Sequence, residues 1–225
     1  TALPDDVATS VPSYNLVYEL VTNGTPILVG SMDTHWPEQG RPTFFNSSFL
    51  FDATGEPLFV YDKQHLVPFG EYIPLPHLLP FLKALTPIQE SFSPGTTSTI
   101  FRLPTRDIPF SPLICFEDTV AHLARAAVRN GARLLINQTN DAWFDPHAAS
   151  RQHMIQSILR AVENGVPLVR VANTGVSCVI DRRGVVTARL EDENGGVSFA
   201  GFKLTEVRPA PNGMPLNFYT RHGDL

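Results

Sequence analysis

The chain has 225 residues, 43% of them hydrophobic, so it can bury a full core and need not contain more than one domain. Its formal net charge is −5 and it has no basic block, which argues against a nucleic-acid partner. Two cysteines do not make a disulfide framework. The sequence contains no uninterrupted apolar stretch of about 18 residues, so no membrane span is predicted. Charged residues are few, at 17%, and there are 20 prolines. This composition predicts a compact domain with rigid, rather apolar loops.

The N-terminal quarter of the chain predicts one helix and three strands. Residues 13–22 carry apolar positions at helical spacing, and Asn23 and Gly24 end that helix. The next elements are a short buried strand at 26–31, a polar loop at 34–43, and a hairpin of strands 44–51 and 58–61.

The loop that follows the hairpin holds Lys63, His65 and Glu71. Pro68 and Gly70 exclude regular structure there, so one rigid segment presents all three side chains. A lysine at a strand end is most often solvated, and a chemical role for it needs a partner motif.

Residues 76–85 form a strongly apolar segment, and a Ser/Pro/Gly-rich stretch with Phe92 follows. Two interpretations stay open for it. The segment either packs in the core or forms an exposed apolar patch that docks on lipid or on a partner.

Two strands follow, at 97–103 and 108–115, and the second ends in Cys115, with Glu117 two residues later. Asp118 and Thr119 can then cap a helix whose apolar positions fall near 3.6-residue spacing. Reacting groups commonly lie where a strand of an α/β sheet ends. Cys115 is therefore a candidate nucleophile if a neighbour favours its thiolate, and otherwise a small buried hydrophobe.

The rest of the chain predicts alternating strands and helices. The strand at 133–137 leads into a polar turn with Trp143 and Phe144, which favours a binding loop. The longest helix is predicted at 147–163, with an apolar face formed by Met154, Ile155, Ile158, Leu159 and Val162. His147 and His153 are expected on its polar face, because no spacing here matches a zinc site. Four strands are expected at 168–172, 177–180, 185–190 and 195–204, with Cys178 in the core, and an extended tail from 208.

Four tracts carry a family resemblance: residues 61–72, the strand end at Cys115 with Glu117, residues 140–144 and residues 171–175. Their order resembles the carbon–nitrogen hydrolase (nitrilase) superfamily and, within it, the extracytoplasmic domain of the bacterial apolipoprotein N-acyltransferase family. The resemblance covers essentially the whole chain. It implies an α/β fold, a four-layer αββα sandwich of two mixed sheets with outer helices, as one domain over 1–225.

The resemblance also implies roles for individual residues. The family uses a Glu–Lys–Cys triad, in which Cys115 matches the nucleophile and Lys63 matches the lysine. Glu71 and Glu117 match accessory carboxylates around the catalytic site. Substrate-binding residues are expected to be His65, Trp143 and Phe144. No metal and no cofactor are expected.

The implied reaction is an acyl transfer in two halves through a thioester on Cys115. A phospholipid is the acyl donor, and the N-terminal amine of a diacylglyceryl-cysteine lipoprotein is the acceptor. The implied location is the periplasmic face of the bacterial inner membrane.

Three departures from the family pattern qualify these expectations. Phe116 stands where tyrosine is frequent, Asp145 stands where glycine is usual, and the triad glutamate is expected directly before Thr1. We therefore expect a domain excised from a longer membrane protein and inactive alone. The rival interpretations are a soluble nitrilase-type amidase and a non-catalytic module that docks lipid or lipoprotein.

Overall fold

The computed structural model describes residues 3, 5–75, 91–104, 106–142, 149–197 and 199–224. Two compact units divide the chain, Ala2–Thr97 and Ser98–Leu225. Each unit has its own sheet, of three strands in the first and six in the second. The apolar segment at 76–85 and the aromatic pair Trp143 and Phe144 lie outside the described residues, as does His147.

The N-terminal unit consists of α1 (Val11–Val21), β1 (Ile27–His35), β2 (Thr43–Phe51) and β3 (Pro57–Asp62). Its strands follow the order β1-β2-β3 with antiparallel ladders, and a parallel bridge joins Asp6 to Met32 of β1. The hairpin is confirmed. The loop expected from residue 34 is wrong at its start, because Thr34 and His35 pair with β2 and lengthen β1.

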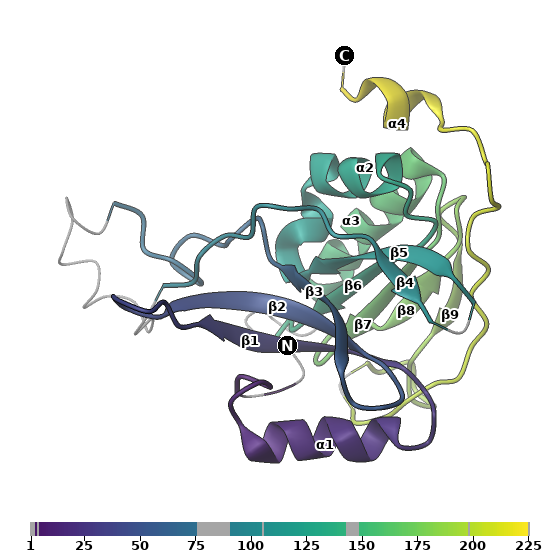
Figure 1. Ribbon diagram of the computed structural model, residues 1–225. Coiled ribbons are helices and arrows are strands. Elements are labelled where there is room, and N and C mark those ends of the chain that lie inside the picture. Colours follow the sequence, from purple (N-terminus) through teal and green to yellow (C-terminus); the bar gives the residue numbers. More distant parts are fainter. Residues whose placement is uncertain are drawn as a thin grey trace. The chain divides into compact units, whose positions relative to one another are not determined.

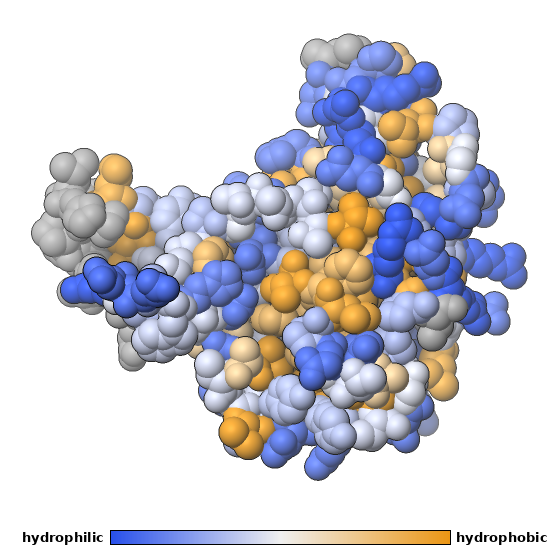
Figure 2. All heavy atoms as spheres, in the orientation of Figure 1, coloured by the Kyte–Doolittle hydropathy of each residue, from blue (hydrophilic) through white to orange (hydrophobic). Residues whose placement is uncertain are grey.

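Helix α1 lies along the three-stranded sheet (Figure 1). Its buried residues Val17 and Val21 share an apolar core with Phe49 and Phe51 of β2. The outer surface of α1 mixes hydrophobic and hydrophilic side chains (Figure 2), with Leu16 among the exposed ones. The helical periodicity of the sequence therefore correctly predicts that α1 buries one of its faces.

The C-terminal unit contains a mixed sheet in the order β4-β5-β6-β7-β8-β9. Its strands are β4 (Phe101–Leu103), β5 (Ile108–Ile114), β6 (Leu135–Thr139), β7 (Leu168–Ala172), β8 (Cys178–Ile180) and β9 (Val186–Arg189). β5, β6 and β7 are parallel to one another, and the other ladders are antiparallel. The carboxyl ends of the three parallel strands therefore meet at one edge of the sheet.

Four helical elements complete this unit: η2 (Cys115–Thr119, a 3-10 helix), α2 (Ala121–Arg129), α3 (Ala149–Asn164) and α4 (Phe218–His222). α2 and α3 lie side by side against the sheet (Figure 1). Leu113, Leu135 and Leu168 of three neighbouring strands meet Ala124 of α2 and Ala161 of α3 in the apolar core. None of the described helices is long and apolar enough to cross a membrane.

Several local expectations were wrong in this unit. Asp118 does not cap α2, whose N-cap is Val120 without a side-chain hydrogen bond. The carboxylate of Asp118 instead binds Arg170. No strand forms among the described residues of 195–204, where Gly195 has a φ of 76° that favours a turn. The tail from 208 is not wholly extended, since it contains α4.

The apolar face expected on α3 was also wrong in part. Ile155, Leu159 and Val162 are 43–49% exposed. The buried residues of α3 are Ser150, His153, Ser157, Arg160, Ala161 and Asn164. Periodicity alone missed this arrangement because the buried face of α3 meets charged groups of the sheet edge.

Candidate active site

Lys63 follows the last residue of β3, and hydrogen bonds engage both its backbone N–H and its backbone carbonyl. Its N–H donates to the Asn46 carbonyl at 2.8 Å, and its carbonyl accepts from the Gly95 N–H at 2.8 Å. The side chain is fully buried, and the Lys63 ammonium Nζ lies 2.8 and 2.7 Å from the two oxygens of Glu71. A buried ammonium needs such a partner, because an unpaired charge in the protein interior is costly.

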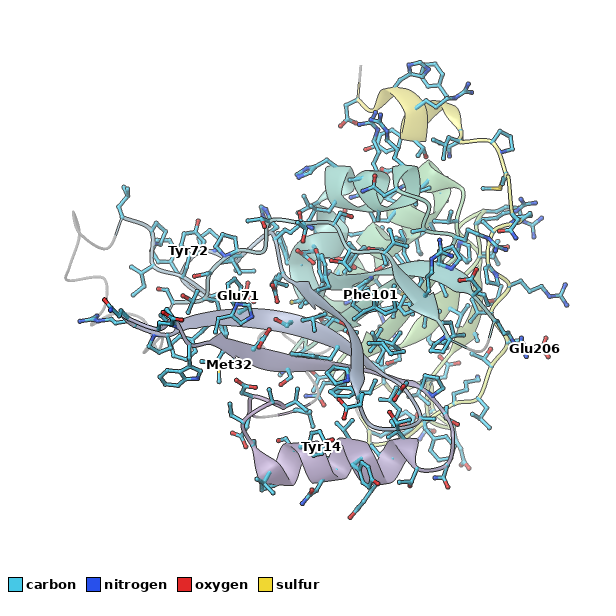
Figure 3. All side chains as sticks on the ribbon, viewed as in Figure 1. Tyr14, Met32, Glu71, Tyr72, Phe101 and Glu206 are labelled. Carbon is cyan, nitrogen blue, oxygen red and sulfur yellow. The ribbon has the colours of Figure 1, made fainter. Side chains whose placement is uncertain are left out.

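Glu71 is fully engaged in this arrangement and lies beside strand β2 (Figure 3). Besides Lys63, its Oε1 accepts from Asn46 Nδ2 and its Oε2 accepts from the Val67 N–H, each at 2.8 Å. The expected contact between Glu71 and Lys63 is thus present. His65 lies in the same loop with an exposed side chain.

Cys115 lies directly after β5, at the first position of η2, and is partly exposed. Its φ of 52° puts a non-glycine residue in the left-handed region. That conformation brings Cβ close to the backbone and costs on the order of 1–3 kcal/mol, which the surroundings must offset. Strained residues of this kind cluster at functional sites.

Two hydrogen bonds support this turn from within the C-terminal unit. The fully buried Glu117 accepts the Ile114 N–H on Oε2 at 2.8 Å. Asn137 of β6 donates from Nδ2 to the Cys115 carbonyl at 3.0 Å. Buried side chains therefore fix the peptide group before Ile114 and the peptide group after Cys115.

Behind the turn lies a cluster that we call the buried charge cluster: Asp118, Asp141, His153 and Arg170. They are 7% exposed or less and come from η2, the segment after β6, α3 and β7. Arg170 donates to Asp118 Oδ2 at 2.7 Å and to Asp141 Oδ2 at 2.9 Å. His153 Nε2 lies 2.7 Å from Asp118 Oδ1, and its Nδ1 lies 2.9 Å from Asp141 Oδ1.

The charges of this cluster cancel when His153 carries a proton. Burial and the positive charge of Arg170, whose Nη2 lies 2.8 Å from His153 Nδ1, would lower the pKa of His153. The hydrogen bonds to Asp118 and Asp141 outweigh both and raise the pKa to about 9. His153 was expected on a polar, solvated face, and this was wrong because two carboxylates draw the ring inward. In the described part of the chain, no group of three or more His, Cys, Asp or Glu side chains could hold a metal ion.

The tract 171–175 gains a structural explanation from this cluster. Gly175 has a φ of 101°, and a Cβ there would lie 2.5 Å from Oδ2 of Asp141. Only glycine lets the chain turn this close to the carboxylate.

The two cysteines differ sharply in their surroundings. Cys178 is buried in β8 as expected, and burial raises the pKa of its thiol to about 11 although Arg170 and Arg189 act in the opposite direction. Cys115 is thus the cysteine available for chemistry. Lys63 and Cys115 belong to different units, and their close approach stays a prediction.

Sequence reasoning missed Asn137, Asp141, His153 and Arg170 as residues of the site. Two signals were available: Asn137 and Asp141 lie at or just beyond the end of a predicted strand, and Asp141 belongs to the tract 140–144. Arg170 gave no such signal, because it stands inside an apolar strand.

Known proteins resemble this chain over most of its length. The family model described as carbon–nitrogen hydrolase matches residues 3–212, which include parts of both units. A protein of Geobacter metallireducens named apolipoprotein N-acyltransferase is 42% identical over 82% of this chain and 34% of its own length. One of the same name from Rhodopseudomonas palustris is 36% identical over all of this chain and 41% of its own length. The chain thus spans between a third and about two fifths of these relatives.

A likeness to solved structures concerns the fold. An amidase from Nesterenkonia sp. AN1, in a mutant whose active-site cysteine has added acrylamide, superposes with a TM-score of 0.59. It is 22% identical, and the match covers 86% of this chain and 68% of the amidase. The expected α/β fold of the nitrilase type is confirmed.

Proposed function

The chain belongs to the carbon–nitrogen hydrolase family, and from this premise we propose that it is the acyl-transferring part of an apolipoprotein N-acyltransferase. The observation that carries the proposal is that Lys63 and Cys115 occur in the chain order of the family's triad and that each is held in place by its surroundings. Lys63 is buried against Glu71, and Cys115 stands in a strained, supported turn at the end of β5. The relatives with the acyltransferase name match across most of the chain.

The proposed reaction has two halves. Cys115 gives up its thiol proton and attacks the ester carbonyl of a phospholipid as the thiolate. The C–O bond breaks, and the lysophospholipid takes up that proton and leaves as an alcohol. The amine of a diacylglyceryl-cysteine then attacks the thioester and loses a proton, the C–S bond breaks, an amide forms, and the proton returns to the Cys115 sulfur. The Lys63 ammonium stabilises the oxyanion in both halves, a contribution of about 3 kcal/mol for a well-placed donor.

The accessory carboxylates are proposed to position groups rather than to move protons. Glu71 already accepts hydrogen bonds from Lys63, Asn46 and the Val67 N–H. Glu117 is buried and accepts the Ile114 N–H. Proton transfer is therefore left to the glutamate that the family resemblance places directly before Thr1.

The substrates and the location are part of the same proposal. The donor is a phospholipid, the acceptor is a lipoprotein, and the domain acts on the periplasmic face of the bacterial inner membrane. His65, with Trp143 and Phe144, is proposed to contact the substrate.

The test uses the full-length protein in detergent with a phospholipid and a diacylglyceryl-cysteine peptide. Intact-mass spectrometry should detect an acyl adduct on Cys115 with phospholipid alone, and the adduct should disappear when the peptide is added. An adduct that forms elsewhere, or transfer without any adduct, would contradict the proposal.

A second candidate is an amidase, which the fold similarity to the Nesterenkonia enzyme favours. The chemistry of the nucleophile is shared, so substrate preference must decide. Rapid release of ammonia from small amides, together with no adduct from phospholipid, would select the amidase.

A further inference from the structure

The conformation of Cys115 needs support beyond the local hydrogen bond from the Ile114 N–H to Glu117. Its φ of 52° is unfavourable for a residue with a Cβ. A residue keeps such a conformation only when the surrounding contacts determine it. The contacts of Asn137 and Arg170 meet this requirement.

Asn137 connects the Cys115 turn to the buried charge cluster. Its Nδ2 donates to the Cys115 carbonyl at 3.0 Å, and its Oδ1 accepts from Arg170 Nη1 at 3.0 Å. The same Nη1 donates to Asp118, which lies three residues after Cys115 in η2. These contacts close a ring from the Cys115 carbonyl through two side chains and back to the same turn.

Every side chain of this ring is protected from water. Asn137 and Asp118 are 0% exposed and Arg170 is 1% exposed. Hydrogen bonds in such surroundings hold a fixed geometry, because water offers no alternative partner and a broken bond leaves a buried polar group unpaired.

The ring also fixes the direction of a backbone donor. In a planar trans peptide the C=O and the following N–H point in opposite directions. Holding the Cys115 carbonyl against Asn137 therefore directs the Phe116 N–H away from Asn137. A fixed N–H beside a nucleophile is suited to a developing oxyanion.

We propose that Asn137 is a positioning residue for acyl transfer: anchored by Arg170 and Asp118, it sets the Cys115–Phe116 peptide and thereby the thiol. This inference rests on the proposed role of Cys115 as the nucleophile. Asn137 touches neither the substrate nor the sulfur in this assignment, and it acts through the peptide that it holds.

The test compares Asn137→Asp with Asn164→Asp in the full-length protein. Aspartate at 137 still accepts from Arg170 but cannot donate to the Cys115 carbonyl. Asn164 is a matched control, because it is also 0% exposed, donates to the Arg160 carbonyl at 3.0 Å and accepts from Thr220 at 3.2 Å. Asn137→Ser is the second variant, since its short, uncharged side chain cannot bridge Cys115 and Arg170.

Two quantities are measured for each variant: kcat and KM for thioester formation from a short-chain ester, and the rate of Cys115 alkylation by iodoacetamide. Both Asn137 variants should lower kcat roughly 10–100-fold, with KM changed less than twofold, because a small misplacement of a reacting group has effects of this size. Asn164→Asp should lose stability without this loss of kcat.

Three outcomes would overturn the inference. The first is wild-type kcat in a folded Asn137 variant, and the second is an equal loss of kcat in Asn164→Asp. The third is a loss in Asn137→Asp alone with normal Asn137→Ser, which would assign the effect to added charge. Cys115→Ala separates the two proposals. If Cys115→Ala is active, Cys115 is not the nucleophile and the proposed function fails. If Cys115→Ala is inactive while Asn137→Ser has normal activity, only the inference about Asn137 fails.

Discussion

The Lys63 site and the Cys115 turn hold their key residues in opposite ways. Among the described residues, Lys63 is paired with one carboxylate, Glu71, which lies eight residues away in the same loop. The Cys115 turn depends on four charged groups whose contacts join residues up to 52 positions apart. One region is a local ion pair, and the other is a network drawn from several elements.

This difference predicts different responses to mutation. When an ion pair has a single partner, removing that partner leaves the other charge buried and alone. In a network, each group has several partners, so one substitution changes the balance of charge without isolating any one group. The four predictions below test this contrast, from the largest expected effect to the smallest.

The largest effect is expected for Cys115 and Lys63, the proposed nucleophile and the proposed oxyanion donor. Cys115→Ala should abolish acyl-enzyme formation, since the attacking sulfur is gone. Lys63→Met should lower its rate roughly 100–1000-fold by removing an oxyanion donor. Intact-mass time courses measure both, with Cys178→Ala as the control that should keep wild-type activity. A fast Lys63→Met enzyme would contradict the donor role.

Iodoacetamide at pH 7 should label Cys115 long before Cys178. The pKa of Cys178 is about 11, so about one in 10⁴ of its thiols is ionised at pH 7, and the side chain is buried as well. Peptide mass mapping of partly labelled protein gives the order of reaction. Earlier labelling of Cys178 would mean that Cys115 has been wrongly assigned as the nucleophile.

Glu71→Gln should destabilise the protein by about 3–5 kcal/mol, because it leaves the buried Lys63 ammonium without a counter-charge. The matched control is Asp107→Asn, which removes the partner of Arg102 from a pair whose side chains are 55% and 79% exposed. That change should cost about 1 kcal/mol or less. Chemical denaturation measures both, and equal losses would remove the contrast between buried and exposed pairs.

The network should give the protein a pH-dependent stability through His153. Its folded pKa of about 9 lies above the ordinary value near 6.5, so its contribution is complete below pH 6.5 and is lost as pH rises through 9. The free energy of unfolding of wild type minus that of His153→Gln should therefore fall between pH 6.5 and 9, by at most ~1.4 kcal/mol per pH unit.

Denaturant titrations at pH 6, 7.5 and 9 measure this difference. The titration of Cys178 cancels in it, because both proteins contain that thiol. A flat difference would mean that His153 is not held in its protonated form by Asp118 and Asp141.

The sequence alone determined the elements whose signal is local. Alternating and helical periodicity placed α1, the β2–β3 hairpin and the parallel strands, because each pattern repeats within a few residues. The motif tracts led to Lys63 and Cys115, and loop chemistry brought Glu71 to Lys63 because eight residues separate them. These features need no knowledge of distant contacts.

Only the tertiary structure decided what surrounds Cys115. Asp118 looked like a helix cap and His153 looked like a solvated residue, since a carboxylate and an imidazole in an exposed helix would take those roles. The parallel order of β5, β6 and β7 brings Asn137 and Arg170 to the edge where α3 presents His153. A charged side chain can be buried only when the fold places an opposite charge from another part of the chain beside it. The periodicity of one segment contains no information about that distant partner.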